Sequence, residues 1–198
     1  MHANLVSSLL ILSLGLVAPA LSAAANTPNI HNSEAPGNLE SNNTLGCIDA
    51  GQVKNSYTPT DLYRAVAACA QSGQYERGVF LFAIAGTYGR FDTLRVADAS
   101  AHQAVAVARM MAISNLDEGQ RTALQDKLQA MLGQPQGLAA TCRQIERIGA
   151  PDYYPRYMVQ HGMQAFLISD GSDGLVKDFD APAAWKQALD SYLHCPAA

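Results

Sequence analysis

Apolar residues recur at spacings of three and four along most of this chain, and no segment alternates between apolar and polar residues as a strand would. The spacing of Leu62, Val66 and Cys69 is typical of a helix that buries one face. Thr58 can cap this helix and Pro59 suits its first position. The pattern predicts six helices, over residues 58–71, 75–88, 91–113, 117–132, 136–148 and 180–195. The expected fold class is therefore all-α.

The second predicted helix is apolar nearly all round, so we expect it at the centre of a compact bundle with helical-hairpin packing. Gly86 and Gly89 are expected to loosen its end. We expect Ser114 or Asn115 to cap the fourth helix. The third helix carries a stripe of small residues suited to close helix contact, which includes Ala97, Ala101, Ala104, Ala108 and Ala112.

Composition favours a packed globule with one core. Hydrophobic residues make up 48% of the chain and charged residues only 15%, which excludes a disordered charged chain. The 17 acidic residues outnumber the 13 basic ones, so the net charge is -4. Without a basic excess to hold a phosphate backbone, we expect no nucleic-acid partner.

Residues 5–21 form an apolar stretch that is too short and too interrupted for a comfortable membrane span, and small residues follow it. This pattern predicts a signal peptide over residues 1–25, with cleavage after Ala23 or Ala25. No cysteine follows the cut, so we expect no lipid anchor and no membrane span after the signal is removed. The protein is predicted to be exported.

The four cysteines are even in number and all follow the predicted signal peptide, as expected where disulfides persist. Their spacing contains no CxxC and no Cys/His cluster, so we expect structural bridges and no metal site. Three pairings are possible. We favour Cys47 with Cys69 and Cys142 with Cys195, because each bridge would tie an end segment to the nearest helix. A disulfide that closes a loop of this length stabilises the fold by about 3 to 4 kcal/mol.

Two segments lack helical periodicity. Residues 26–56 are rich in Asn, Ser, Pro and Gly, which predicts a disordered tail before a single helical domain over residues 57–198. Residues 152–180 form a long region rich in Tyr, Pro and Gly, and a loop of that length is usually functional or poorly ordered. Its end has a weak likeness to a calcium loop, but Ser169 and Gly171 stand where acidic ligands are required. We expect a solvated turn there, and no cofactor.

Residues 73–85 resemble the second helix of a tetratricopeptide-type repeat. The resemblance depends on Gly73, Tyr75, Gly78, Phe82 and Ala85. It covers this helix alone, and no second copy follows. It therefore implies a helical hairpin rather than a peptide-binding superhelix.

The region 57–195 also resembles a set of poorly characterised exported proteins of Gram-negative bacteria. The resemblance is carried by Asp61-Leu62-Tyr63 with Cys69, by VFLFAIAG at 79–86, by FDTLRV at 91–96, by YPRYM at 154–158, and by Trp185 with YLHC at 192–195. It implies a periplasmic protein without established enzyme activity. Protection of the cell against a secreted antibacterial toxin is one role that it implies.

Catalytic signatures are absent from the sequence: it contains no GxSxG, HExxH, P-loop, GxGxxG or SxxK motif. We therefore expect no enzyme. The less favoured alternative is a small hydrolase that uses His102 with Asp98, which is four residues away, or with a residue of the loop region 152–180. Another alternative is an envelope adaptor that binds an extended peptide in a concave face.

Candidate partner-binding residues form two clusters, because protein interfaces rely on a few aromatic or arginine anchors. One cluster could instead be a salt-bridge network, and the other could instead be loop packing. We favour the second as the site for a protein partner, a cognate toxin, because loop aromatics held by proline present contact area at small entropic cost. The first cluster is Arg90, Asp92 and Arg95, and the second is Tyr153, Tyr154, Arg156 and Tyr157.

Overall fold

The computed structural model of the chain describes residues 34–167 and 172–196. The chain divides into two units at residue 32, and every described residue belongs to the second unit. The signal peptide predicted for residues 1–25 and the first part of the predicted tail lie outside the described residues.

Helix α1 (Pro59–Gln71) begins at the predicted cap. The Thr58 hydroxyl accepts a hydrogen bond from the Asp61 amide, and the Asp61 carboxylate accepts one from the Thr58 amide. This reciprocal arrangement satisfies donors that a helix start leaves open. Gly73 follows the helix with a φ of 72°, a conformation that glycine adopts without steric strain. The chain can therefore turn back at once into the next helix.

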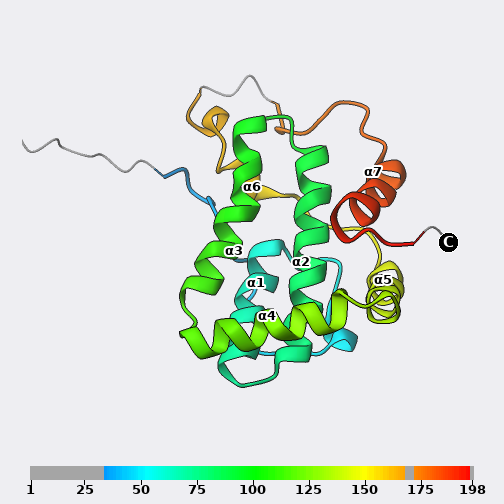
Figure 1. Ribbon diagram of the computed structural model, residues 1–198. Coiled ribbons are helices and arrows are strands. Elements are labelled where there is room, and N and C mark those ends of the chain that lie inside the picture. The colour runs from blue at the N-terminus through cyan, green and yellow to red at the C-terminus, as the bar shows by residue number, and fades with distance from the viewer. Residues whose placement is uncertain (1–33, 168–171, 197–198) are drawn as a thin grey trace, which may run out of the picture. The chain divides into compact units, whose positions relative to one another are not determined.

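Helix α2 (Tyr75–Arg95) lies in the middle of the unit, with α3 to its left and α7 and α5 to its right in Figure 1. It packs along α1 as a helical hairpin. The described residues contain no strand, which confirms the all-α prediction. The largest fully buried side chains come mainly from these two helices: Leu62, Tyr63, Val66, Val79, Leu81, Ile84 and Tyr88.

The prediction that Gly86 and Gly89 loosen the end of this helix is wrong, because α2 continues through both glycines to Arg95. Their missing side chains leave room for neighbours. A Cβ on Gly86 would overlap the Tyr192 ring, and a Cβ on Gly89 would overlap the Val105 side chain. Both glycines serve close packing within a continuous helix.

The single helix predicted over residues 91–113 is also wrong. After α2 the chain passes through an extended segment and the 3-10 helix η2 (Ala99–Gln103) before α3 (Ala104–Ser114) begins. Val96 forms an isolated antiparallel bridge with Leu175, which comes from far along the sequence. That pairing takes the backbone of Val96 out of the helical conformation.

The later helices largely follow the prediction. The caps are Asp117 for α4, where Ser114 or Asn115 was expected, and Asp180 for α7, at the start of the range predicted for the last helix. A short extra helix, α6, lies within the segment expected to be a loop. The bounds are α4 (Glu118–Leu132), α5 (Pro135–Ile148), α6 (Arg156–Val159) and α7 (Ala181–Ala188), after which a π-helical turn covers Leu189–Leu193.

The expectation of a disordered tail is wrong for residues 34–56, which pack against the helices. The buried Asp61 carboxylate accepts hydrogen bonds from the Ser41 hydroxyl at 2.6 Å and from the Asn43 amide at 2.8 Å. The Leu39 amide donates to the Tyr157 carbonyl at 3.1 Å. Polar side chains that suggested disorder are thus partners of a buried charge, which compensates for the entropy of ordering the segment.

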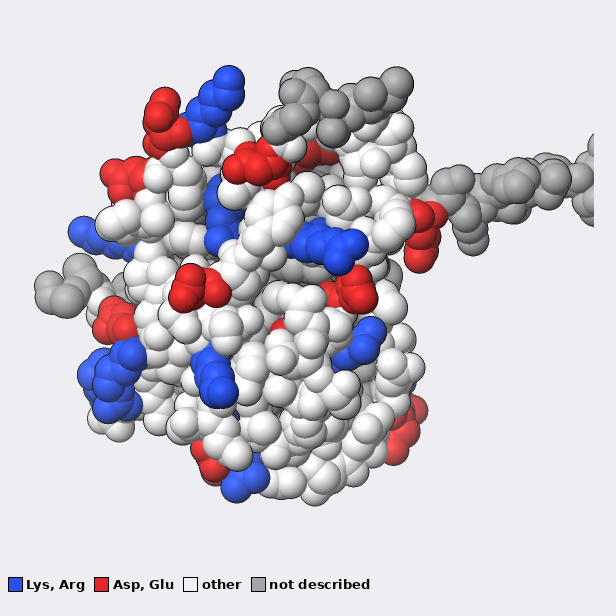
Figure 2. Space-filling model, turned by 180° about the vertical axis from the view of Figure 1, so that it is seen from behind, with Lys and Arg blue, Asp and Glu red and all other residues white. Residues whose placement is uncertain are grey.

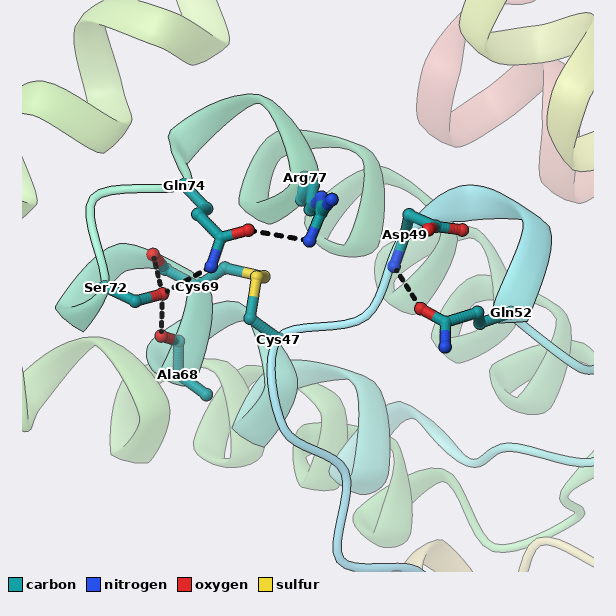
Figure 3. Close-up of a disulfide and its surroundings, with 8 residues drawn as sticks. All are labelled: Cys47, Asp49, Gln52, Ala68, Cys69, Ser72, Gln74 and Arg77. Atoms are coloured by element: carbon teal, nitrogen blue, oxygen red, sulfur yellow. Dashed lines mark hydrogen bonds between the residues drawn. A yellow bond between two sulfur atoms is a disulfide. The ribbon is translucent and has the colours of Figure 1, made fainter.

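Both predicted disulfides are present. Cys47 is bonded to Cys69 on α1, and Cys142 on α5 is bonded to Cys195. Figure 3 shows the first bridge holding the N-terminal segment beside the end of α1. The two bridges tie both ends of the described chain to the helical bundle.

Candidate functional site

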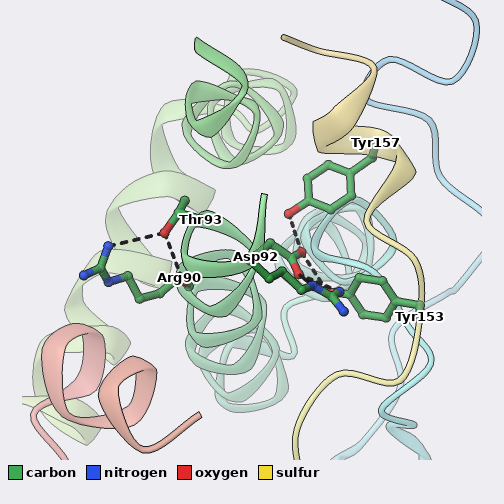
Figure 4. Close-up of polar contacts among 6 residues, drawn as sticks. Arg90, Asp92, Thr93, Tyr153 and Tyr157 are labelled. Atoms are coloured by element: carbon green, nitrogen blue, oxygen red, sulfur yellow. Dashed lines mark hydrogen bonds and ion pairs between the residues drawn. The ribbon is translucent and has the colours of Figure 1, made fainter. Parts of the chain in front are cut away.

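The two clusters predicted from the sequence meet at one buried carboxylate. Asp92 lies on α2 and is fully buried. Its Oδ2 atom accepts hydrogen bonds from the Tyr157 hydroxyl at 2.7 Å and from the Tyr153 hydroxyl at 3.0 Å. The Arg95 Nε atom donates to Oδ1 at 2.8 Å. Figure 4 shows both tyrosines reaching Asp92 from the segment beside α2.

Arg95 completes this buried cluster. Its guanidinium lies 5.1 Å from the centre of the Phe91 ring and 4.9 Å from the centre of the Tyr153 ring, within cation–π range. Burial raises the pKa of Asp92, and the Arg95 guanidinium and the two hydroxyls act in the opposite direction. Burial also raises the pKa of the Tyr157 hydroxyl well above its usual value, so Tyr157 stays a donor. The cluster fixes the segment containing Tyr153 and Tyr157 onto α2.

Most of the residues predicted to bind a partner are not on the surface. Asp92, Arg95 and Tyr157 are buried and Tyr153 is partly buried, so these residues serve mainly as internal support. Arg90 points away from Asp92, as Figure 4 shows, and donates hydrogen bonds to the Ser191 and Thr93 hydroxyls. Of the seven candidate residues, the structure leaves two well exposed, Tyr154 and Arg156.

Tyr154 and Arg156 face different neighbours. The Tyr154 side chain is 46% exposed, and its hydroxyl donates to the Asp173 carbonyl at 2.7 Å. The Arg156 guanidinium donates to the Pro36 carbonyl at 3.3 Å and lies 3.9 Å from the Glu40 carboxylate. In the second predicted cluster, Tyr153 and Tyr157 therefore point inward to Asp92, whereas Tyr154 and Arg156 are exposed.

Tyr154 borders a hollow of about 390 Å³, named here the Tyr154 pocket. The pocket lies between the extended segment after α2 and the segments on both sides of residues 168–171. Its apolar walls include Val96, Val159 and Leu167. Its polar lining includes Asp98, Gln160 and Gln164.

Exposed apolar side chains gather along the segments that line this pocket. Met163 and Phe166 lie on the 3-10 helix η3 (Met163–Phe166), and Met163 is 75% exposed. Leu167 follows them and is 68% exposed, and Val176 is also exposed. Large exposed apolar groups near a hollow are typical of interaction sites. No hydrophobic periodicity in the sequence indicates these residues, because this segment is not a regular amphipathic helix.

Asp98 is the charged residue in the described lining of the pocket. The sequence pattern suggested it as a partner of His102 in a hydrolase. Its Oδ1 atom accepts from the Ser100 amide at 2.9 Å and from the Ser100 hydroxyl at 2.6 Å. Its Oδ2 atom accepts from the Gln164 amide at 3.0 Å. Partial burial would raise the pKa of Asp98, but these donors together hold it below its usual value. Asp98 is therefore ionised at neutral pH.

The pair that a hydrolase was predicted to use has separate partners. The His102 Nε2 atom lies 2.9 Å from the Val96 carbonyl oxygen, whereas Asp98 is held by Ser100 and Gln164. Among the described residues no three His, Cys, Asp or Glu side chains gather as metal ligands would. Part of the calcium-like segment, residues 168–171, lies outside this description.

The surface carries few charges, as the composition indicates. On the face seen in Figure 2, basic and acidic residues are scattered among uncharged ones and form no broad area of one sign. Within the described residues, no helix has the length and apolar character needed to cross a membrane.

No family model, curated protein or solved structure matched the chain in three comparisons. The resemblances of residues 57–195 and 73–85 stay predictions.

Proposed function

We propose that this protein is a non-enzymatic binding protein of the periplasm that inhibits a secreted antibacterial toxin. The observation that carries the proposal is the exposed apolar surface around the Tyr154 pocket. A hollow of about 390 Å³ bordered by exposed Tyr154 and Leu167 has the character of a protein-binding site, where an anchor enters a pocket and apolar contacts surround it.

The segment that carries Tyr154 is held rigidly against α2, which favours binding of a partner. Tyr154 is flanked in sequence by Tyr153 on one side and by Tyr157 a turn further on, and both donate to the buried Asp92. An aromatic side chain held in this way loses little conformational entropy when a partner binds. The surface is therefore suited to tight inhibition.

The disulfides support the proposed compartment. Cys47–Cys69 and Cys142–Cys195 are compatible with an oxidising, exported environment, where such bridges form and persist. The predicted signal peptide and the resemblance to exported proteins of Gram-negative bacteria favour the periplasm within that class.

The first experiment identifies the toxin. Each open reading frame that neighbours the gene is expressed in the periplasm, with and without this protein, and cell growth is measured. We expect one neighbour to be toxic alone and harmless in the presence of this protein. The absence of rescue for every neighbour would count against the proposal.

The second experiment locates the interface. Replacing Tyr154 and Arg156 by Ala should weaken toxin binding by at least about 2 kcal/mol, roughly 30-fold in Kd. The thermal midpoint should hardly move, because both side chains are exposed. Met110→Ala is the control, since Met110 is also an exposed large apolar residue and lies on α3 outside the pocket. A sharp fall in the midpoint of the double variant would instead assign these residues to packing.

A second candidate function is the envelope adaptor, which one observation favours. A groove of about 600 Å³ lies against α1 and α3 and is lined by small residues including Ala67 and Ala108, with exposed Met111 at its side. Filling it with Ala68→Trp, at a lining residue that is only half-buried, would abolish binding of extended peptides if this groove were the functional site. Toxin rescue that is unaffected by the same variant would favour inhibition at the Tyr154 pocket.

A further inference from the structure

The size of the Tyr154 pocket limits what can enter it. Its volume of about 390 Å³ is at the lower end of the range for ligand sites. A single long side chain from a partner protein fits a hollow of this size. Val96, Val159 and Leu167 supply apolar walls for the stem of such a side chain.

Among its described lining residues, the pocket carries charge of one sign. Asp98 alone is charged among the described residues that line it. Its hydrogen bonds to Ser100 and Gln164 keep it ionised. No Lys or Arg in the described part of the chain lies within ion-pair distance of it. The Oδ2 atom accepts one named hydrogen bond, so it retains capacity for a further donor.

A side chain with an apolar stem and a planar cation at its end matches both the apolar walls and the Asp98 carboxylate of the pocket. The Asp98 carboxylate can accept hydrogen bonds from a guanidinium, and Tyr154 lines the same pocket with an aromatic side chain, a group that attracts cations. Arginine is also the charged residue most enriched at binding hot spots. We propose that the Tyr154 pocket takes an arginine side chain of the partner, with its guanidinium against Asp98. This inference rests on the proposed function, because it names the anchor that the toxin would supply.

The pocket can be tested without the partner by using a fragment of the anchor. The probe is propylguanidinium, and N-propylurea is the neutral compound of nearly the same shape. Both are titrated into the full exported protein, with its two disulfides formed, and amide NMR shifts of Val96, Gln164 and Gly174 are followed. We expect saturable shifts and binding of the cation about five-fold tighter than the urea, the sum of a partly exposed ion pair and a cation–π contact.

Asp98→Asn tests whether the carboxylate carries this preference. The amide keeps the size of the side chain and one acceptor for the Ser100 amide, but it gives up the hydrogen bond from the Gln164 amide, so we expect a folded variant with a slightly lower thermal midpoint. The five-fold preference should fall to about one-fold. Asp49→Asn is the matched control, because Asp49 also caps a 3-10 helix, η1 (Ala50–Gln52), and accepts from the amide two residues on at 2.9 Å, yet lies outside the pocket. Circular dichroism and the thermal midpoint check the fold of both variants.

Three results would overturn the inference: no binding of propylguanidinium, equal binding of the cation and the urea, or an unchanged preference in the Asp98→Asn variant. These outcomes are separate from the fate of the proposed function. Toxin rescue that depends on Tyr154 while the guanidinium preference is absent would remove the arginine anchor alone. A guanidinium preference that depends on Asp98, without rescue by any toxin, would remove the inhibitor function alone.

Discussion

Tyr157→Phe removes one hydroxyl from the buried carboxylate cluster and leaves the ring in place. The Tyr157 hydroxyl donates to Asp92 Oδ2 at 2.7 Å, and both side chains are buried. Water cannot replace the lost donor without a rearrangement of the core. The variant therefore isolates the contribution of one charge-assisted hydrogen bond to stability.

The expected loss in the free energy of unfolding is about 2 kcal/mol, because a hydrogen bond to a charged group contributes about 1.5 to 3 kcal/mol. For a domain of this size, about 1 kcal/mol shifts the thermal midpoint by about 2 to 4 °C. The midpoint of Tyr157→Phe should thus fall by about 4 to 8 °C.

The assay is urea unfolding followed by circular dichroism, with both disulfides intact. Tyr154→Phe is the matched control: its hydroxyl also donates at 2.7 Å, but to the Asp173 carbonyl and from an exposed side chain. We expect the control to lose no more than about 0.5 kcal/mol. Equal losses in the two variants would refute the reasoning, since burial and charge would then add nothing to the hydrogen bond.

Two further predictions concern packing and pH. Gly86→Ala should destabilise the protein by about 1 to 3 kcal/mol because its Cβ would overlap the Tyr192 ring. Gly119→Ala in α4, whose Cβ would contact only the Asp117 carboxylate at 3.3 Å, should be close to neutral, and urea midpoints compare the two variants. Burial would raise the pKa of Asp61, but its hydrogen bonds from Ser41, Asn43 and Thr58 hold that pKa below the usual value. Asp61 therefore stabilises the fold above about pH 4, the unfolded-state pKa, and this contribution is lost as the pH falls through the lower folded-state pKa. Asp61→Asn should lower the urea midpoint at pH 7 and flatten its fall in acid; an unchanged acid profile would contradict the assignment.

Local signals predicted most helix boundaries. The Thr58 cap and Pro59 at the first position of α1 act through neighbours within a few residues, so they are readable without the fold. The disulfide pairing followed from the order of the cysteines and helices along the chain. The caps depend on residues that are close in sequence, and the disulfide pairing links each end segment to the nearest helix.

Long-range contacts decided what local patterns could not. The break at Val96 accompanies its bridge to Leu175, and Gly86 leaves the room that the Tyr192 ring occupies against α2. The order of residues 34–56 likewise depends on the buried Asp61, which gives polar side chains a partner that composition alone does not reveal. Each of these contacts joins residues that are far apart in sequence, and helical periodicity is a local pattern that does not indicate such pairs.

The candidate site shows the same division. The sequence by itself identified the Tyr153 to Tyr157 segment as a concentration of aromatic and proline residues, but it could not assign an inward or outward direction to each tyrosine, because no regular period governs that segment. The tertiary structure decided that Tyr157 donates to Asp92, 65 positions earlier, while Tyr154 stays exposed. It also brought Asp98 beside residues 159–167 to form the pocket. The helices follow from nearest-neighbour chemistry, and the site follows from contacts that exist only once those helices have packed.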